Sequence, residues 1–265
     1  MPSSLSASLL HANPPQKLFS VLGVPVSLIQ IPDVVAQIEK WIGEPNGCRS
    51  IAVTGMHGVT EAQHDPTFKI ILNAADMVVP DGMPLVWLAR FKGHKLERRV
   101  YGPELMATFF ESTTENGYRH FLYGSTPAVL QRLSDALQKR FPGTVIAGTY
   151  SPPFRDLTPE EDAAIVAKIN EANPHVVWVG LSTPKQEQWI FRHRHVLGAA
   201  VAVGVGAAFD INSGTKKQAP RWMREHGLEW LFRLCQEPRR LWRRYLLQGS
   251  QFVFYVVRES LGFRS

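Results

Sequence analysis

The stretch HFLYGSTPAVLQRLSDALQKRF, residues 120–141, contains the pattern that decides the fold. A short β-rich run over residues 120–123 is followed by a turn of small residues and then by a helical pattern over residues 128–141. In α/β proteins strands lead into helices in this way, and each helix packs back on the sheet. The segment therefore predicts one strand–turn–helix unit of a parallel sheet.

The same alternation recurs along most of the chain. β-rich runs also lie at residues 50–54, 77–79, 144–147, 176–179 and 200–205, and helical patterns at 31–42, 60–73, 84–91, 103–115, 159–171 and 185–196. This spacing predicts an α/β domain over residues 18–214, with a Rossmann-like, mostly parallel sheet flanked by helices on both faces. Residues 1–17 are polar and contain prolines, and we expect them to form a disordered tail.

Composition excludes several classes of protein. A chain of 265 residues with 45% hydrophobic and 20% charged residues has enough apolar content for a core, and is neither disordered nor fibrous. Its two cysteines cannot build a disulfide scaffold and suit a reducing cytoplasm. The longest apolar stretch, residues 199–209, is shorter than the ~20 residues of a membrane span, and residues 1–17 lack the features of a signal peptide. We expect a protein that is soluble or at most attached to a membrane.

The charge is concentrated at the C-terminal end. Residues 227–265 carry four of the six excess positive charges, together with eight aromatic residues. We interpret residues 215–265 as a basic helical appendage on the α/β domain. In residues 239–247 arginines alternate with apolar residues so that a helix would carry the guanidinium groups along one face. Such a segment suits an anionic partner, which is a phosphate group, a lipid surface or a nucleic acid, although it also fits a helix that simply packs on the domain.

Candidate functional residues follow the strand patterns, because ligands of open α/β sheets bind outside the carboxyl ends of the strands. Thr54 offers a hydroxyl after one strand, and Asp81, between a proline and a glycine, offers a rigidly held carboxylate suited to a general base. Gly124 and Ser125 precede a helix start, where free N–H groups bind anions. Gln186 begins another helix after a strand. Ordinary turns, helix caps and solvated polar residues remain the alternative interpretation of each position.

Other motifs argue against metals and dinucleotides. Thr158 and Glu161 form a capping box, so the acidic residues around them are better explained by a helix start than by metal binding. Residues 204–209 lack the third glycine of a dinucleotide fingerprint, which disfavours a dehydrogenase. The nine histidines form no zinc motif, and no Asp-x-Asp pair is present, so we expect no metal and no cofactor. Arginines would then have to stabilise any departing diphosphate.

These elements, in this order, resemble the WecG/TagA/CpsF family of bacterial glycosyltransferases. The resemblance runs from about residue 21 to about residue 259, and its most specific part is APRWMREHGLEWLFRLCQEPRRLWRRY, residues 219–245. Further matching segments are DMVVPDGMPLVW, ERRVYGPELM, FLYGS, STPKQEQW and VGVGAAFDINSG. The resemblance implies an inverting, metal-independent enzyme that moves a sugar from a UDP-sugar onto a sugar carried by undecaprenyl diphosphate. It would work in cell-surface or exopolysaccharide biosynthesis, at the cytoplasmic, inner face of the plasma membrane.

The resemblance also implies roles for individual residues. Asp81 falls on the proposed catalytic base, and Thr54 on an active-site threonine. Donor and diphosphate binding falls to seven residues: Arg99, Gly124, Ser125, Gln186, Arg233, Arg240 and Arg243. An anionic membrane surface would meet the aromatic residues Trp242, Tyr245, Phe252 and Phe254. The same aromatic face also suits a second copy of the chain, and a homo-oligomer is therefore possible.

One departure from the family pattern concerns the donor. Where many members read Thr-x-Asn, this chain reads Thr54-Gly55-Met56, followed by His57. The missing amide leaves both a UDP-N-acetylmannosamine-type donor and UDP-glucose open, and whether Met56 or His57 contacts the sugar is equally open. Two alternatives from other classes are a basic nucleic-acid-binding module, which has no recognised motif here, and a nucleotide-dependent oxidoreductase.

Overall fold

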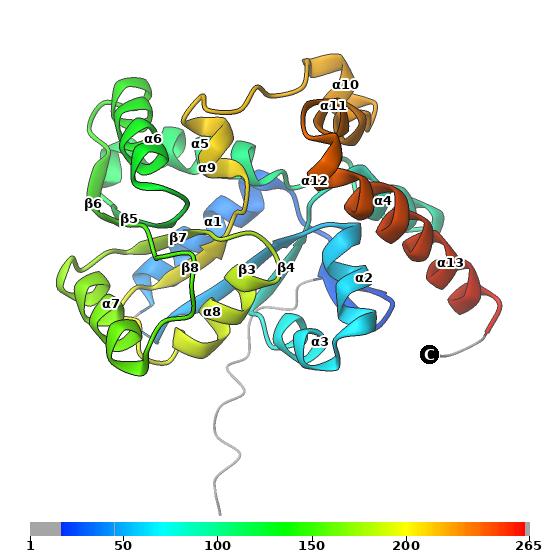
Figure 1. Cartoon of the computed structure of the whole chain (residues 1–265), viewed down its shortest axis with the longest axis horizontal. Helices are drawn as coiled ribbons and strands as arrows, with labels where there is room; N and C mark the ends of the chain where they lie inside the picture. The colour runs from blue at the N-terminus through cyan, green and yellow to red at the C-terminus, as the bar shows by residue number, and fades with distance from the viewer. Residues whose placement is uncertain (1–16, 45, 263–265) are drawn as a thin grey trace, which may run out of the picture.

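A six-stranded, entirely parallel sheet forms the centre of the molecule (Figure 1). The computed structural model describes residues 17–44 and 46–262, so nearly all of the predicted tail, residues 1–17, lies outside the described residues. The strand order is β4-β3-β8-β7-β5-β6. The bounds are β3 Arg49–Thr54, β4 Met77–Pro80, β5 Arg119–Gly124, β6 Val145–Tyr150, β7 Val176–Gly180 and β8 Val201–Gly204. All six predicted strands are confirmed, and so is the parallel α/β architecture.

Helices cover both faces of the sheet. The first eight are α1 Ile31–Gly43, α2 Met56–His64, α3 Pro66–Asn73, α4 Met83–Phe91, α5 Gly102–Thr113, α6 Pro127–Arg140, α7 Pro159–Glu171 and α8 Lys185–His193. A 3-10 turn, Thr114–Asn116, follows α5, and a short helix α9, Ala208–Asn212, follows β8. The helix predicted over residues 60–73 is divided in two. Asp65 caps α3 by accepting hydrogen bonds from the amides of Thr67 and Phe68, and Pro66 takes the first helical position.

Side chains that alternate along the strands separate the core into layers. Ile51 and Val53 of β3 point into the layer under α1, α5, α6 and α9, whereas Ala52 points into the layer under α2, α3 and α4. In β7, Trp178 lies in the first layer, while Val177 and Val179 pack toward α7 and α8. This is the alternation that a strand dictates, and it explains why the buried strands read as continuous apolar runs. A hairpin missed by the sequence patterns, β1 Leu18–Val21 and β2 Val24–Ser27, adds a separate two-stranded sheet.

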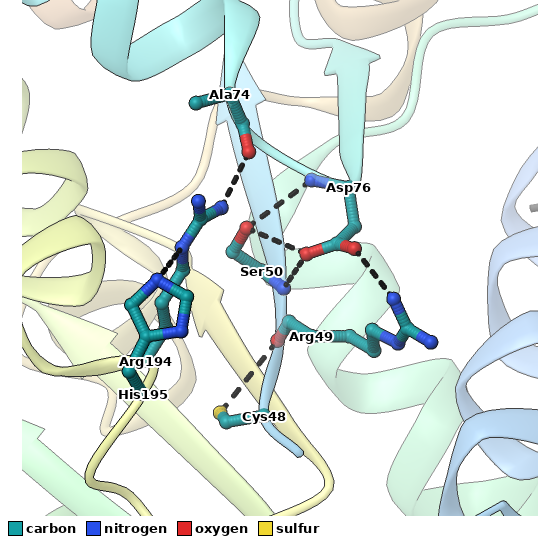
Figure 2. Close-up of polar contacts among 7 residues, drawn as sticks. All are labelled: Cys48, Arg49, Ser50, Ala74, Asp76, Arg194 and His195. Atoms are coloured by element: carbon teal, nitrogen blue, oxygen red, sulfur yellow. Dashed lines mark hydrogen bonds and ion pairs between the residues drawn. The ribbon is translucent and has the colours of Figure 1, made fainter. Parts of the chain in front are cut away.

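A polar network fixes the amino ends of β3 and β4 (Figure 2). The Asp76 carboxylate accepts hydrogen bonds from the backbone N–H of Ser50 at 2.9 Å and from its hydroxyl at 3.0 Å. Its other oxygen pairs with the Arg49 guanidinium at 3.1 Å. Arg194, just after α8, donates to the carbonyl of Ala74. This network therefore stabilises the amino ends of the two strands. Ligands of open α/β sheets bind at the opposite edge, where the strands have their carboxyl ends.

The C-terminal region consists of helices that pack against the α/β domain. They are α10 Arg221–Glu225, α11 Glu229–Gln236, α12 Pro238–Trp242, a π-helical turn at Arg243–Leu247, and α13 Gln248–Ser260. Helix α13 lies against α2, and its Phe252 is buried in the core layer of α2, α3 and α4. The division into a domain and an appendage near residue 215 stays a prediction. Among the described residues, no helix combines the length and the apolar character needed to cross a bilayer.

Candidate active site

A cavity of about 800 Å³ lies at the carboxyl ends of the strands. Its walls include residues that follow β3, β4, β5, β6, β7 and β8, together with three arginines of the C-terminal helices. Parallel strands end on the same edge of a sheet, so residues far apart in sequence meet there. The cavity is large enough for a small organic ligand, since such sites range from about 300 to 1,000 Å³.

Asp81 supplies a carboxylate to this cavity. It lies directly after β4, it lines the cavity, and no hydrogen bond to its carboxylate is found among the described residues. Burial raises the pKa of Asp81 to about 6, the Arg99 charge opposes this rise, and Glu229 adds to it. A carboxyl group with a pKa close to neutrality is suited to accept a proton from a substrate.

The end of β3 holds Asp81 in place. The backbone N–H of Asp81 donates to the carbonyl of Thr54 at 2.8 Å. A Cβ on Gly55 would stand 2.3 Å from the Asp81 carbonyl oxygen, and a Cβ on Gly58 would stand 2.1 Å from the Thr54 hydroxyl. Both glycines therefore permit a close approach that no larger residue allows. Thr54 itself is fully buried and does not line the cavity, so its contribution is to hold the backbone of Asp81 in place.

Guanidinium groups from the C-terminal helices face the same cavity. Arg233 of α11, Arg240 of α12 and Arg244 of the π-helical turn all line it. The predicted single row of arginines is wrong: Arg243 is exposed and stacks on Trp242, with its guanidinium carbon 5.4 Å from the ring centre. Arg243 and Arg244 are successive residues of a helical segment and point about 100° apart, so Arg244 faces the cavity while Arg243 does not. Arg244, missed as a site residue, takes the place expected of Arg243.

His57 lies beside Arg244. A terminal nitrogen of the Arg244 guanidinium is 2.7 Å from Nε2 and 3.0 Å from Nδ1 of the His57 ring. Burial, followed by the positive charges of Arg244 and Arg233, holds the pKa of His57 well below its ordinary value. The ring is therefore neutral at physiological pH and accepts a hydrogen bond from Arg244. Met56, by contrast, packs against the apolar core layer of α2, α3 and α4 and is absent from the cavity wall.

Arg99 is paired with an acid that sequence patterns did not single out. Its guanidinium forms a salt bridge with Glu229 of α11, a residue only 5% exposed. The Tyr101 hydroxyl donates to the other oxygen of the same carboxylate, and the Arg99 guanidinium lies 4.2 Å from the Tyr101 ring centre. Arg99 does not line the cavity in this structure. It thus binds α11 to the α/β domain, close enough for its charge to act on Asp81.

Three further predicted residues, Gln186, Ser125 and Gly124, differ in how they relate to the cavity. Gln186 accepts from the Gly206 N–H at 2.9 Å and donates to Glu187 at 2.9 Å, so it holds the turn after β8. Ser125 lines the cavity, and its backbone N–H donates to the Gly180 carbonyl at 3.2 Å. Gly124 is not part of the wall. At the start of α6, the Val129 amide already donates to the Thr126 hydroxyl at 3.3 Å, so the free amides expected there are partly used.

The aromatic residues predicted to meet a membrane differ in exposure. Trp242 is 41% exposed and Phe254 62% exposed, whereas Tyr245 is half-buried. The prediction for Phe252 is wrong, because this residue is 5% exposed and packs inward. Within residues 17–44 and 46–262, no three His, Cys, Asp or Glu side chains gather in a way that could hold a metal ion.

A carboxylate with a raised pKa and a group of guanidiniums line one cavity of an α/β fold, an arrangement typical of enzymes that act on anionic substrates. Sequence comparison agrees, because residues 19–265 match the glycosyl transferase WecG/TagA/CpsF family. The chain belongs to this family and is a glycosyltransferase.

Similar proteins include transferases from Bacillus and Staphylococcus. The N-acetylglucosaminyldiphosphoundecaprenol N-acetyl-beta-D-mannosaminyltransferase of Bacillus spizizenii is 34% identical over 200 residues, which cover 76% of this chain and 75% of the relative. The enzyme of the same name from Bacillus subtilis strain 168 is 34% identical, with 72% of each chain covered. That of Staphylococcus aureus strain MW2 is 32% identical, again with 72% of each covered.

Proposed function

We propose that this glycosyltransferase is an inverting, metal-independent enzyme that transfers a sugar from a UDP-sugar to a sugar carried on undecaprenyl diphosphate. The observation that carries the proposal is the shared cavity of Asp81 and the guanidiniums of Arg233, Arg240 and Arg244. The names of the similar bacterial enzymes specify a lipid diphosphate acceptor bearing N-acetylglucosamine, and they support the acceptor class.

The proposed reaction uses the negative charge of one carboxylate and the positive charges of the guanidinium groups. Asp81 accepts the proton of the acceptor hydroxyl as its oxygen attacks the anomeric carbon of the donor. The bond from that carbon to the diphosphate breaks on the opposite side, so the configuration inverts and UDP departs. The negative charge that develops on the departing diphosphate meets the arginines, which take the part that a metal ion plays in other enzymes. Arg99 stays bound to Glu229 and holds α11 over the site.

The donor sugar is either of the N-acetylmannosamine type or glucose. The names of the relatives support the first. The presence of Met56 in place of an asparagine keeps the second open, since its thioether packs into the core and offers no amide to an N-acetyl group. His57 is the polar side chain of this segment that lines the cavity, and we place it near the donor.

A donor panel tests the proposal directly. The full chain is incubated with UDP-N-acetylmannosamine, UDP-glucose and other UDP-sugars, with a short polyprenyl-diphosphate N-acetylglucosamine as acceptor and with EDTA present. We expect UDP release from one donor and an inverted anomeric centre in the product by NMR. Loss of activity in EDTA, retention of configuration, or no release from any donor would each refute a part of the proposal. We do not propose a nucleic-acid-binding or an oxidoreductase function, because the chain belongs to a family of glycosyltransferases.

A further inference from the structure

Glu187, in the first turn of α8, is a second buried carboxylate next to the cavity. The residue is 4% exposed and is not itself part of the cavity wall. Its Oε1 accepts two hydrogen bonds, one from the Thr183 hydroxyl and one from Nε2 of Gln186, each at 2.9 Å. Its Oε2 is also buried, and no hydrogen-bond partner for it is found in the part of the chain that the structure describes. Burying a carboxylate is unfavourable, and the two donors on Oε1 offset part of this cost.

Both donors belong to residues that line the cavity. Thr183 follows β7, Gln186 lies at the start of α8, and both are in the wall that also contains Asp81. A Cβ on Gly204, the last residue of β8, would stand 3.1 Å from Nε2 of Gln186, so this side chain packs closely on the strand. Glu187 therefore contacts the wall from outside and restrains two of its side chains.

The amide of Gln186 is fixed at both ends by groups of opposite kinds. The backbone N–H of Gly206 can only donate, and it meets the amide oxygen at 2.9 Å. An ionised carboxylate can only accept, and that of Glu187 meets the amide nitrogen. Rotating the amide by 180° would place its NH₂ against an N–H and its carbonyl against a carboxylate. Both contacts would be repulsive, so the amide has one orientation.

This orientation does not depend on the ionisation of Glu187. Burial raises the pKa of Glu187, and the hydrogen bond from Gln186 opposes the rise. A proton on the carboxyl group would go to Oε2, because Oε1 already accepts from two donors. Oε1 therefore remains an acceptor in both protonation states.

The fixed amide leaves one donor for a ligand. Nε2 of Gln186 carries two hydrogens, and Glu187 is its one acceptor among the described residues. Since Gln186 lines the cavity, the second N–H is available to an oxygen atom of a bound substrate. Phosphate and sugar oxygens accept such a bond, whereas an amide oxygen in the same place would repel a phosphate.

We propose that Glu187 is a positioning residue of the transfer reaction, which orients the Gln186 amide so that an N–H, and not the carbonyl oxygen, meets an oxygen of the bound UDP-sugar. The effect on turnover rests on the proposed function, whereas the orientation of the amide does not.

Two substitutions of similar length separate the acceptor from the bulk of the side chain. Glu187→Gln keeps an oxygen at the position of Oε1, and Glu187→Met removes it. We expect kcat/KM for the UDP-sugar, measured by UDP release, to fall about tenfold in Glu187→Met and to stay within about twofold in Glu187→Gln. Ile190→Val, which removes one methyl group from a buried residue of the same helix, is the control for loosening of α8 and should leave kcat/KM unchanged.

A double-mutant cycle tests whether Glu187 acts through Gln186. In a chain that already carries Gln186→Ala, Glu187→Met should reduce kcat/KM by no more than about a further twofold, because the amide that it orients is gone. Additive losses would show that Glu187 acts on the rate through the fold instead, and full activity of Gln186→Ala would show that the amide is not used. Either result would overturn the inference.

Hydrogen exchange of the Gln186 side chain gives a readout without turnover. Its NH₂ signals in a ¹H–¹⁵N NMR spectrum are those that disappear in Gln186→Ala. We expect slow exchange in the unaltered chain and in Glu187→Gln, and fast exchange in Glu187→Met. Equally slow exchange in Glu187→Met would overturn the positioning role. Absence of UDP release by the unaltered chain, with the expected exchange pattern, would refute the proposed function and leave the orienting contact established.

Discussion

Arg99, in the segment between α4 and α5, forms a salt bridge with Glu229, the first residue of α11. The two residues are 130 positions apart in the chain, and both are largely buried. Their pairing joins the C-terminal helices to the edge of the sheet that bears Asp81. Glu229 also raises the pKa of Asp81, after burial has made the larger contribution. The same contact therefore holds the arginine-bearing helices in place and tunes the proposed base.

Replacing Glu229 by Gln should shift the pH dependence of turnover. The proposed base must be ionised, so activity should rise with pH through the pKa of Asp81, which is about 6. Without the Glu229 charge, and with the Arg99 charge no longer neutralised, that pKa falls and the acidic limb moves to lower pH. The pH profile of kcat/KM measures the shift. Glu225→Gln, at an exposed residue of α10, is the control, and an identical shift there would contradict the explanation.

Arg244→Ala and Arg243→Ala form a matched pair. Arg244 lines the cavity, whereas its neighbour Arg243 is exposed and stacks on Trp242. Loss of one charge-assisted contact to a diphosphate should weaken UDP binding about tenfold or more in Arg244→Ala, since such bonds contribute roughly 1.5–3 kcal/mol. Isothermal titration with UDP compares the two. Equal losses in both variants would mean that net charge, and not position in the cavity, determines affinity.

Gly55→Ala should impair catalysis by moving Asp81. The new methyl group would lie 2.3 Å from the Asp81 carbonyl oxygen, so the loop after β4 must shift. A misplacement of about 1 Å costs on the order of 10²-fold in rate. Gly43→Ala, with no atom within 4 Å of the added Cβ, is the control and should leave turnover unchanged. A fully active Gly55→Ala enzyme would show that the position of Asp81 is less important than we infer.

The sequence predicted the fold well because its signals are local. Strands such as residues 176–180 are continuous apolar runs, and Thr158 with Glu161 forms the expected capping box at the start of α7. The hairpin of β1 and β2 was missed, since its two short strands are joined at Leu22 and Gly23, which give no strong turn pattern.

The site was predicted in part. The position of Asp81 at the cavity was predictable, because a carboxylate directly after a buried parallel strand lies at the ligand-binding edge, and its role as the base is our proposal. Glu229 and Arg244 were not predicted as site residues, because their roles depend on long-range contacts. The first pairs with a residue 130 positions earlier, and the second lies in a π-helical turn whose start no residue pattern marks. Phe252 was assigned to a membrane because an apolar run does not reveal which of its residues point inward.

Asp81→Asn should also change stability in a pH-dependent way. The folded-state pKa of Asp81, about 6, is above its value of 3.8 in an unfolded chain, so ionisation in the folded protein is unfavourable. The contribution to stability is complete below pH 3.8 and is lost as pH rises through about 6. At pH 8 the neutral asparagine should therefore stabilise the fold by about 2–3 kcal/mol, and less at pH 5. Urea unfolding at both pH values measures the difference, and a pH-independent effect would contradict the raised pKa.

The most direct test of the central claim is the turnover of Asp81→Asn, measured together with its affinity for UDP at pH 8. Removal of a general base lowers the rate by about 10²-fold or more, while the arginines proposed to bind the diphosphate are untouched. We predict a loss of that size in kcat with UDP binding close to that of the unaltered enzyme. Normal turnover, or a large loss of UDP affinity that accounts for the defect, would contradict the role of Asp81 as the base.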